Sequence, residues 1–380
     1  MRSYEETITW LRYRIDLEGA PPSFWLILGG CAAEIRHLGS IPLSGAEARR
    51  SERNVLASGM HARLAMDGIN LSTDQIEQHL SGKLRLPATQ ESAQLELDAL
   101  LHAEQQIRHG TRGKSAPLTP DRIQAIHRTL TERSTEQDLP GQWRSQPLGS
   151  KPSDGVPPEV IGLFMEELCD WLNSPELTSP SEEETVAYAL IRLLLAELYL
   201  VWIRPFAVGH ARVSGIVAQY LLAEAGVGST AEHLVAMHFH RHGREFQRQV
   251  SQASEGQADP IPFITYALRG LAEGLRELHE RVRIMQTSGQ WRAQLLDLFS
   301  DATDGPTQRQ RRLLLDLGEY MDPVPLTRLP KLSTALANLY AGVSEKTLRR
   351  DVDALVSAGV LRKSTEGFMV ERGNLLAFKH

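Results

Sequence analysis

Hydrophobic residues recur at helical spacing along most of the chain, and the alternation typical of strands is sparse. The pattern therefore predicts a mostly α-helical protein with one or two small hairpins. The clearest run begins near Ser181, where Ser181 and Glu184 have the spacing of a capping box, and apolar residues then repeat to about Ile203. A helix this apolar is expected in the core.

A tight turn interrupts the apolar pattern directly after this helix. Pro205 ends the helix, Gly209 permits a turn, and apolar residues resume at Val213 and continue to Gly226. A helix that begins after a glycine turn presents free N–H groups, and Arg212 falls in its first turn, so the pattern predicts an anion site. The alternative is a plain helical hairpin with a solvated Arg212.

The segment from Ile203 to Gly215 resembles the signature of the Fic (Fido) family, H-P-F-x-[D/E]-G-N-G-R-x-x-R. Four residues are in register with it: Pro205, Phe206, Gly209 and Arg212. Five differ, because Arg204 replaces the catalytic His, Val208 the metal-binding acid, His210 the Asn, Ala211 the second Gly and Gly215 the last Arg. The resemblance implies an AMP-transferase fold with a degenerate active site.

In that family the His takes a proton from a target hydroxyl, the acid holds magnesium, and the loop amides bind nucleotide phosphates. Arg204 cannot act as a base near neutral pH, and Val208 offers magnesium no oxygen ligand. Family-type AMP transfer is therefore not expected, whereas Arg204, Gly209, His210, Ala211 and Arg212 are expected to bind ATP or another phosphate ligand. The alternative is an active transferase that uses His210 or the substrate as base.

The resemblance extends beyond this motif, over roughly residues 50 to 280. Pro140–Arg144 resembles the turn before the family's target-binding hairpin flap, and the flap itself is expected to include Leu148, Gly149, Val156 and Pro157. That flap binds a protein segment as an added strand. Residues 64–72 resemble the inhibitory helix, whose acid corresponds to Asp67. Since its partner position is Gly215, we expect no ion pair there.

The C-terminal segment has its own charge and pattern. From Thr307 onward the chain has 12 Lys and Arg residues and 8 Asp and Glu residues, a net charge of +4, although the whole chain carries −6. Helices are expected near Gln310–Tyr320, Ser333–Tyr340 and Ser344–Gly359, followed by two short strands. This resembles a winged helix-turn-helix, which implies DNA binding through Lys346, Thr347, Arg349 and Arg350. A dimerisation or protein-interaction module is the alternative.

Composition and length set the remaining expectations. We expect an N-terminal helical region over 1–100, a Fic-like core over 101–300 and the winged helix over 305–380. Two cysteines and the lack of a signal pattern or of an apolar run of ~18 residues favour a cytoplasmic protein outside the membrane. His238 and His242 could supply only half of a metal site, so no metal is expected.

These patterns favour a DNA-binding regulator, with a homodimer expected from operator symmetry. A pure protein-interaction role through the flap is a third hypothesis.

Overall fold

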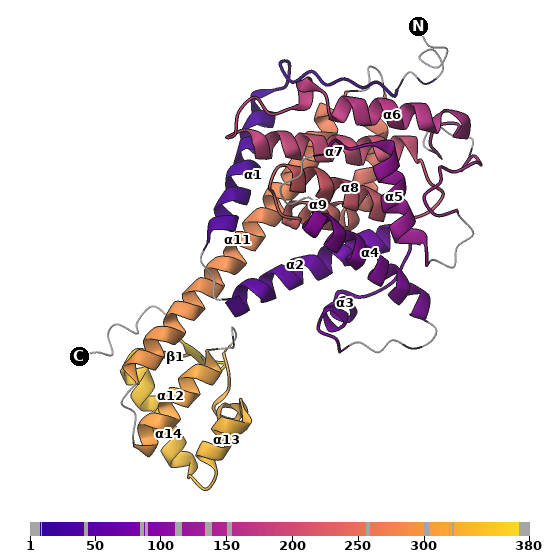
Figure 1. Ribbon diagram of the computed structural model, residues 1–380. Coiled ribbons are helices and arrows are strands. Elements are labelled where there is room, and N and C mark those ends of the chain that lie inside the picture. Colours follow the sequence, from indigo (N-terminus) through magenta and orange to yellow (C-terminus); the bar gives the residue numbers. More distant parts are fainter. Residues whose placement is uncertain are drawn as a thin grey trace. The chain divides into compact units, whose positions relative to one another are not determined.

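The computed structural model is mostly helical and divides into two compact units, Met1–Pro42 with Ala48–His279, and Leu43–Glu47 with Glu280–His380 (Figure 1). The structure describes residues 8, 10–41, 45–83, 87, 90–110, 116–133, 139–149, 154–255, 259–299, 304–318, 320 and 323–371. The boundary between the units falls inside helix α11, Ile261–Leu298.

The first unit packs helices around one central hairpin of two apolar helices. That hairpin consists of α7 (Thr185–Ile203) and α8 (His210–Glu224). Around it lie α1 (Pro22–Ser40), α2 (Gly45–Met66), α3 (Thr73–Leu80), α4 (Glu91–Gly110), α5 (Pro120–Thr131), α6 (Ile161–Leu172), α9 (Thr230–Arg241) and α10 (Gly243–Ala253). Two short 3-10 helices, η3 (Pro158–Val160) and η4 (Pro175–Leu177), flank α6.

Helix α7 forms the centre of this unit because its surface is apolar nearly all round. It packs against α8, α6 and α1. By length and hydropathy α7 could cross a membrane, which corrects the expectation that no apolar run is long enough; 78% of its apolar window is buried by neighbouring helices. It begins at Thr185 without a side-chain cap, so the predicted capping box does not form.

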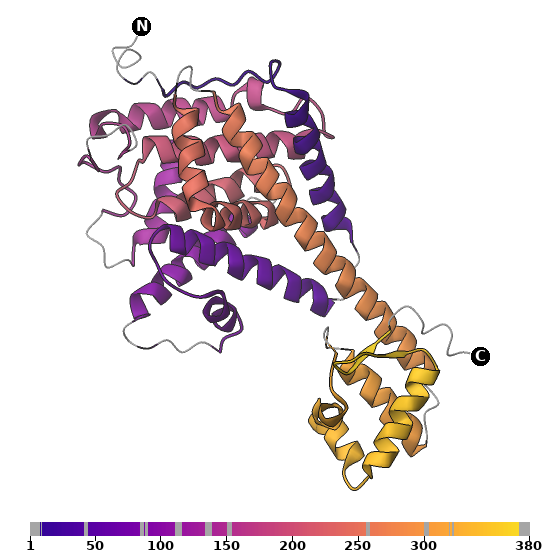
Figure 2. The ribbon, with the colours of Figure 1, turned by 180° about the vertical axis from the view of Figure 1, so that it is seen from behind.

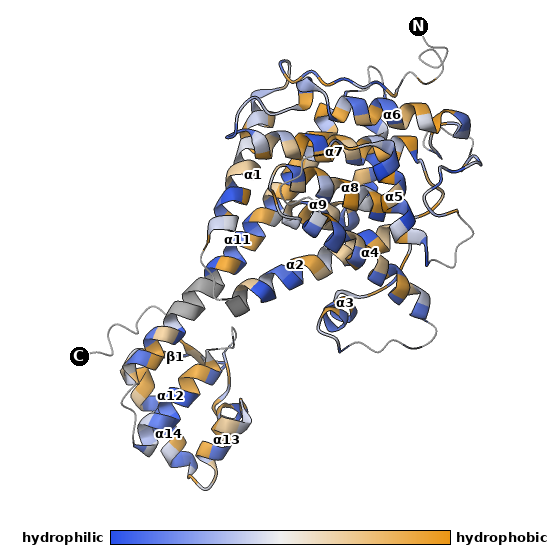
Figure 3. Cartoon of the chain, in the orientation of Figure 1, coloured by the Kyte–Doolittle hydropathy of each residue, from blue (hydrophilic) through white to orange (hydrophobic). Residues whose placement is uncertain are grey.

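The outer helices carry both hydrophilic and hydrophobic residues, as Figure 3 shows for α2, α4 and α5. Helices α1 and α11 lie side by side (Figures 1 and 2), joined by the Cys31 thiol, which donates to the Leu268 carbonyl, and by an ion pair of Glu34 with His279. Burial raises the pKa of the Cys31 and Cys169 thiols to about 12, which keeps both in the thiol form near neutral pH.

The second unit contains α12 (Gly305–Leu317), the 3-10 helix η5 (Leu326–Lys331), α13 (Thr334–Tyr340), α14 (Glu345–Ser357), β1 (Leu361–Lys363) and β2 (Phe368–Val370). Strands β1 and β2 pair antiparallel, with Arg362 opposite Met369. Val324 forms an isolated bridge to Phe368. Helix α12 begins earlier than expected because the carboxylate of Asp304 caps it by accepting the N–H of Thr307 at 2.8 Å.

The core of the second unit extends further toward the N-terminus than the sequence pattern indicated. Trp291 and Leu295 of α11, and Phe299 directly after it, are buried together with Leu348 and Leu355 of α14. The break predicted at 304–306, where α12 begins, therefore lies within this hydrophobic unit. Residues before it contribute part of the core.

The flap segment does not show the predicted hairpin in its described residues, 139–149 and 154–160, which form turns and η3. The remaining part, 150–153, lies outside the described residues. The two-stranded hairpin that the structure does contain is β1 and β2.

Candidate functional site

The loop between α7 and α8 has a conformation set by two left-handed residues. Arg204 ends α7 with φ 48° and ψ 64°, and Gly209 precedes α8 with φ 73°. A left-handed conformation costs a non-glycine residue about 1–2 kcal/mol, so Arg204 is strained. Among the described residues Arg204 is the one non-glycine residue with a positive φ. The strain lies at the position of the family's catalytic His.

Arg144 holds this loop in place, although the sequence analysis did not include it among the site residues. Its Nε donates to the Arg204 carbonyl at 2.7 Å, and its backbone N–H donates to the Pro205 carbonyl at 2.9 Å. A further guanidinium N–H donates to the Val156 carbonyl, while the Val156 N–H donates to the Ile203 carbonyl at 3.3 Å. Burial, together with the charge of Arg204, lowers the pKa of Arg144.

Phe206 anchors the middle of the loop by aromatic packing. Its ring stacks on that of His127, with centroids 3.8 Å apart and planes 4° apart, and Trp143 lies on it at 5.0 Å. The Gly141 N–H donates to His127 Nδ1 at 3.0 Å, so the neutral ring has no proton on that nitrogen. Burial and the neighbouring His210 lower the pKa of His127 to about 4, which keeps the ring neutral near pH 7.

Asp67 occupies the N-terminus of α8, where an anion site is expected. Its carboxylate accepts the backbone N–H of Ala211 at 2.8 Å and that of Arg212 at 3.2 Å. It also accepts Arg212 Nε at 2.8 Å, and the same guanidinium donates to Glu96. Gly215 offers Asp67 no ion-pair partner, as the sequence indicates, but Asp67 pairs with Arg212 instead. Arg212 is the earlier motif arginine, three residues before the position of Gly215.

Arg212 and both carboxylates are almost completely buried. Burial alone would lower the pKa of Arg212, but the charges of Asp67 and Glu96 raise it. Arg212 is thus a fully paired cation and is not available to a ligand in this arrangement.

Arg63 of α2 fills the space that a side chain at position 215 would need. A Cβ on Gly215 would lie 2.8 Å from Arg63 Nε and 3.0 Å from Glu232 Oε1. Arg63 Nε donates to Glu232 at 2.7 Å, and the other guanidinium nitrogens donate to Glu197. The guanidinium that the motif lacks on α8 is therefore supplied near that place by another helix. The sequence pattern does not indicate Arg63 as a site residue, because its contacts cross between helices.

A cavity of about 180 Å³ opens beside this loop. Its lining includes Asp67, Glu197, Arg204, Phe206, His210 and Phe246. The Arg204 guanidinium has neither a hydrogen bond nor an ion pair within the part of the chain that the structure describes. His210 Nε2 is buried and likewise lacks a hydrogen-bond partner among these residues. The cavity thus contains one unpaired cation and one unsatisfied ring nitrogen.

His210 is a poor general base. Burial, followed by the charge of Arg204, lowers its pKa to about 4, so the ring is neutral at pH 7 but accepts a proton weakly. The two carboxylates that line the cavity, Asp67 and Glu197, are each paired with an arginine. Val208 offers no oxygen ligand. The donor set therefore does not fit magnesium, and the arrangement suits binding of an anion at Arg204 better than proton abstraction.

The predicted flap residues adjoin the loop without forming part of the cavity lining. Val156 is buried beneath it, Leu148 is 38% exposed, and Pro157 is exposed at the start of η3. Gly149 lies against Asp154, whose carboxylate would be 2.1 Å from an added Cβ. Of these four flap residues, Val156 is the one with a backbone hydrogen bond to the end of α7, to the Ile203 carbonyl, among the described residues.

The four predicted DNA-binding residues lie together on the second unit, near the start of α14. Lys346, Arg349 and Arg350 are exposed, and Thr347 is half-buried with its hydroxyl 3.1 Å from that of Ser344. Arg349 pairs with Glu345 at 2.9 Å, so it is partly neutralised.

The two histidines considered as half of a metal site do face each other. The rings of His238 and His242 lie 4.9 Å apart. Among the described residues no group of three His, Cys, Asp or Glu side chains is placed to hold a metal ion.

Residues 117–222 match the model of the Fic/DOC family. The protein adenylyltransferase Fic of Nematostella vectensis is 26% identical over 234 residues, which are 60% of this chain and 50% of that protein. The chain thus spans about half the length of this curated relative. A Fic family protein from Desulfovibrio desulfuricans G20 has a similar structure, with a TM-score of 0.53, 17% identity, 92% of this chain and 96% of that chain covered.

Fic-1 of C. elegans is also similar in structure, with a TM-score of 0.54 and 16% identity over 68% of this chain and 73% of that chain. At these identities the structures show the fold alone. Residues 117–222 thus match the Fic/DOC family, and the solved structures have a similar fold.

Proposed function

We propose that this chain is a regulatory protein whose Fic site binds a phosphate-bearing ligand without transferring AMP, while its C-terminal unit binds DNA. The observation that supports this most is the pairing of Asp67 with the N-terminus of α8 and with Arg212, beside an Arg204 that cannot accept a proton. The backbone N–H groups at the start of α8, which the family resemblance assigns to nucleotide phosphates, are thus bound by a carboxylate of the chain itself.

A ligand would have to displace Asp67. A phosphate group could accept the same backbone N–H groups and gain the unpaired Arg204. The cavity of about 180 Å³ is smaller than the roughly 300 Å³ at the low end for ligand pockets, so a whole nucleotide does not fit until Asp67 moves. We therefore propose that phosphate groups compete with Asp67, and that ATP binds only in the displaced state.

Loss of transfer is tested with α-labelled ATP, magnesium and cell lysate. We expect no covalent label on any protein, because neither a base nor a magnesium ligand is present at the motif. Label that disappears in Arg204→Ala would instead establish an active transferase with altered chemistry. The Arg204→Ala variant is suited to this purpose because Arg204, unlike Arg212, has no ion pair with any described residue, so its loss should not disturb folding.

Competition with Asp67 is tested by calorimetric titration of phosphate and of ATP into Asp67→Asn. The variant removes the internal carboxylate charge, so we expect affinity to rise at least about tenfold over the unmodified chain, or about 1.4 kcal/mol. Asp74→Asn, an exposed position on α3, is the matched control and should not change affinity. Equal or no binding in all three proteins would contradict the proposal.

The arrangement of the second unit supports DNA binding. Helices α12, α13 and α14 followed by the β1–β2 hairpin have the order of a winged helix-turn-helix, and α14 directs Lys346 and Arg350 to solvent. We propose that α14 enters the major groove.

A fluorescence titration with a labelled DNA duplex tests this at several salt concentrations. Lys346→Gln with Arg350→Gln should weaken binding and reduce the slope of log affinity against log salt by about 2. The control is Arg244→Gln with Arg269→Gln, which removes the same charge from exposed positions of the first unit. An equal loss in both double variants would mean that net charge alone accounts for binding.

A further inference from the structure

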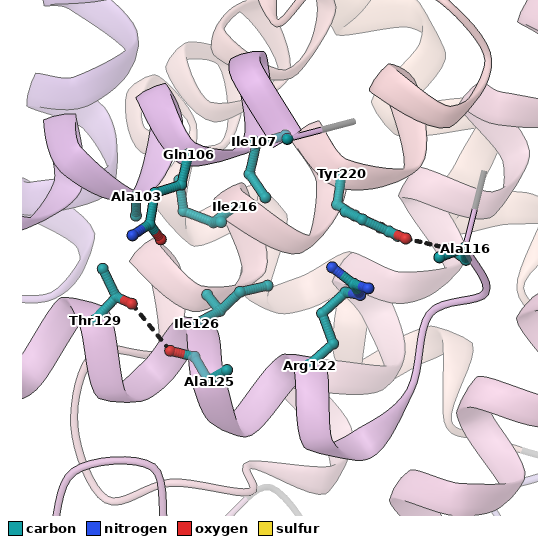
Figure 4. A pocket seen from close by; sticks show the side chains of 11 residues that line it. Ala103, Gln106, Ile107, Ala116, Arg122, Ala125, Ile126, Thr129, Ile216 and Tyr220 are labelled. Atoms are coloured by element: carbon teal, nitrogen blue, oxygen red, sulfur yellow. Dashed lines mark hydrogen bonds between the residues drawn. The ribbon is translucent and has the colours of Figure 1, made fainter. Parts of the chain in front are cut away.

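A second cavity of about 270 Å³ lies between α4, α5 and α8, apart from the motif loop (Figure 4). Apolar side chains form most of its wall. They include Ala103 and Ile107 from α4, Ile126 from α5 and Ile216 from α8. No residue of this lining belongs to the lining of the motif cavity. An apolar pocket of this kind suits the apolar part of a small ligand.

One cation lies at one end of this cavity. Arg122 extends from α5 beneath the Tyr220 ring, with its guanidinium carbon 4.7 Å from the ring centroid (Figure 4). Tyr220 is fixed there because its hydroxyl donates to the Ala116 carbonyl. Thr129, at the other end, donates to the Ala125 carbonyl at 3.1 Å. Thr129 therefore uses its proton within its own helix. Gln106 adds a neutral amide to the wall, and the positive charge of the lining lies at Arg122.

Arg122 is not satisfied within the described residues. Its Nε is buried and has no hydrogen-bond partner among them. The carboxylate of Glu224 is close enough to interact electrostatically, but Arg192 already donates to it at 3.0 Å. A buried donor without a partner is destabilising, and an anionic ligand group would supply the missing acceptor.

We infer that this cavity binds a small amphipathic anion, a monocarboxylate with an apolar chain or ring, whose carboxylate pairs with Arg122. The apolar body lies against Ile107, Ile126 and Ile216, and Tyr220 covers the charged end. The volume is slightly below the roughly 300 Å³ at the low end for ligand pockets, which suits only a small molecule. The inference is independent of the motif site and of any AMP transfer.

Isothermal titration of the full chain with octanoate, and with 1-octanol as its uncharged counterpart, tests the inference. We expect octanoate to bind and octanol to bind at least about tenfold more weakly, because only the carboxylate pairs with Arg122. Arg122→Gln should weaken the binding of octanoate by a similar factor and leave the affinity for octanol unchanged. Absence of octanoate binding at millimolar concentration, or equal affinity for octanol, would overturn the inference.

Two further variants separate the charge from the cavity. Arg133→Gln removes an exposed positive charge just beyond α5 and should leave octanoate binding unchanged. Ala125→Leu enlarges an exposed side chain at the lining and should weaken octanoate and octanol alike by occupying space. Circular dichroism confirms that each variant folds. A loss of binding in Arg133→Gln equal to that in Arg122→Gln would refute Arg122 as the anion's partner.

Discussion

Arg204 has a backbone conformation that suits glycine better than arginine. Its φ of 48° brings its Cβ against Gly155, where an added Cβ would lie 2.9 Å from that of Arg204. Pro205 and Gly209 allowed the turn to be predicted from the sequence, because proline fixes φ and glycine allows positive φ. The left-handed state of Arg204 could not be predicted, since it depends on Arg144 holding the Arg204 carbonyl.

Replacing Arg204 with Gly should relieve this strain. We expect the free energy of unfolding to rise by about 1 kcal/mol, while any binding of phosphate to the loop is lost. Urea denaturation gives the stability, and Arg204→Ala is the control because it removes the guanidinium but keeps the Cβ. An equal gain in the alanine variant would show that charge, and not backbone strain, is responsible.

His233 provides a pH-dependent contribution to stability. Burial alone would lower its pKa, but Glu104 and Glu232 raise it to about 10, against about 6.5 in the unfolded chain. The contribution is fully present below about pH 6.5 and is lost as the pH rises to about 10, by up to about 1.4 kcal/mol per pH unit. Unfolding free energies measured from pH 6 to 10 check this.

The matched variant for the pH experiment is His233→Gln. It should be less stable at pH 7, because Glu104 and Glu232 lose a buried cation, and its stability should vary less over the same range. Parallel pH profiles for the two proteins would assign the dependence to other groups.

At the scale of helices, α2 and α8 are joined by a buried charge network that no helical period indicates. Arg63 pairs with Glu197 of α7 and Glu232 of α9, and the Ser214 hydroxyl donates to Glu197 at 2.7 Å. Periodicity located α7 and α8 because it reports which residues face the core. It does not report which buried charges meet across three helices. The absence of an arginine at 215 could therefore be read from the sequence, but the place of Arg63 near that position could not.

Restoring the motif therefore requires a change outside it. Gly215→Arg should destabilise the chain by several kcal/mol, because its side chain competes with Arg63 for the same space. Arg63→Ala should cost about 3–5 kcal/mol by leaving Glu197 and Glu232 unpaired. The double variant should be more stable than the sum of these losses implies, and a double-mutant cycle by urea denaturation measures the difference. Simple additivity would refute a shared space.

At the scale of the whole chain, the two units have separate hydrophobic cores, and the second core includes residues that precede its turn-rich start. The sequence located the strands and the helices of this unit within a few residues, but assigned Trp291 to the preceding segment. The turn-rich sequence at 304–306 is typical of a domain boundary. Burial shows that residues before it also belong to the core of the second unit.

A fragment comparison tests this assignment. Residues 280–371 should unfold cooperatively, whereas residues 304–371 lack Trp291, Leu295 and Phe299 and should lose several kcal/mol. Thermal circular dichroism compares the two fragments, and Trp291→Ala within the longer one should reproduce part of the loss. A short fragment as stable as the long one would place the α11 residues outside the core.

The position of Arg63 against Gly215 has a consequence for sequence evolution as well as for stability. An arginine on α2, four residues before the acid Asp67, excludes any side chain at the last motif position. The two positions should therefore be inherited as a pair. Homologues with arginine at the position of 63 should carry glycine at that of 215, and those with the motif arginine should have a small residue on α2. An alignment in which the two positions vary independently would show that the exclusion is particular to this chain.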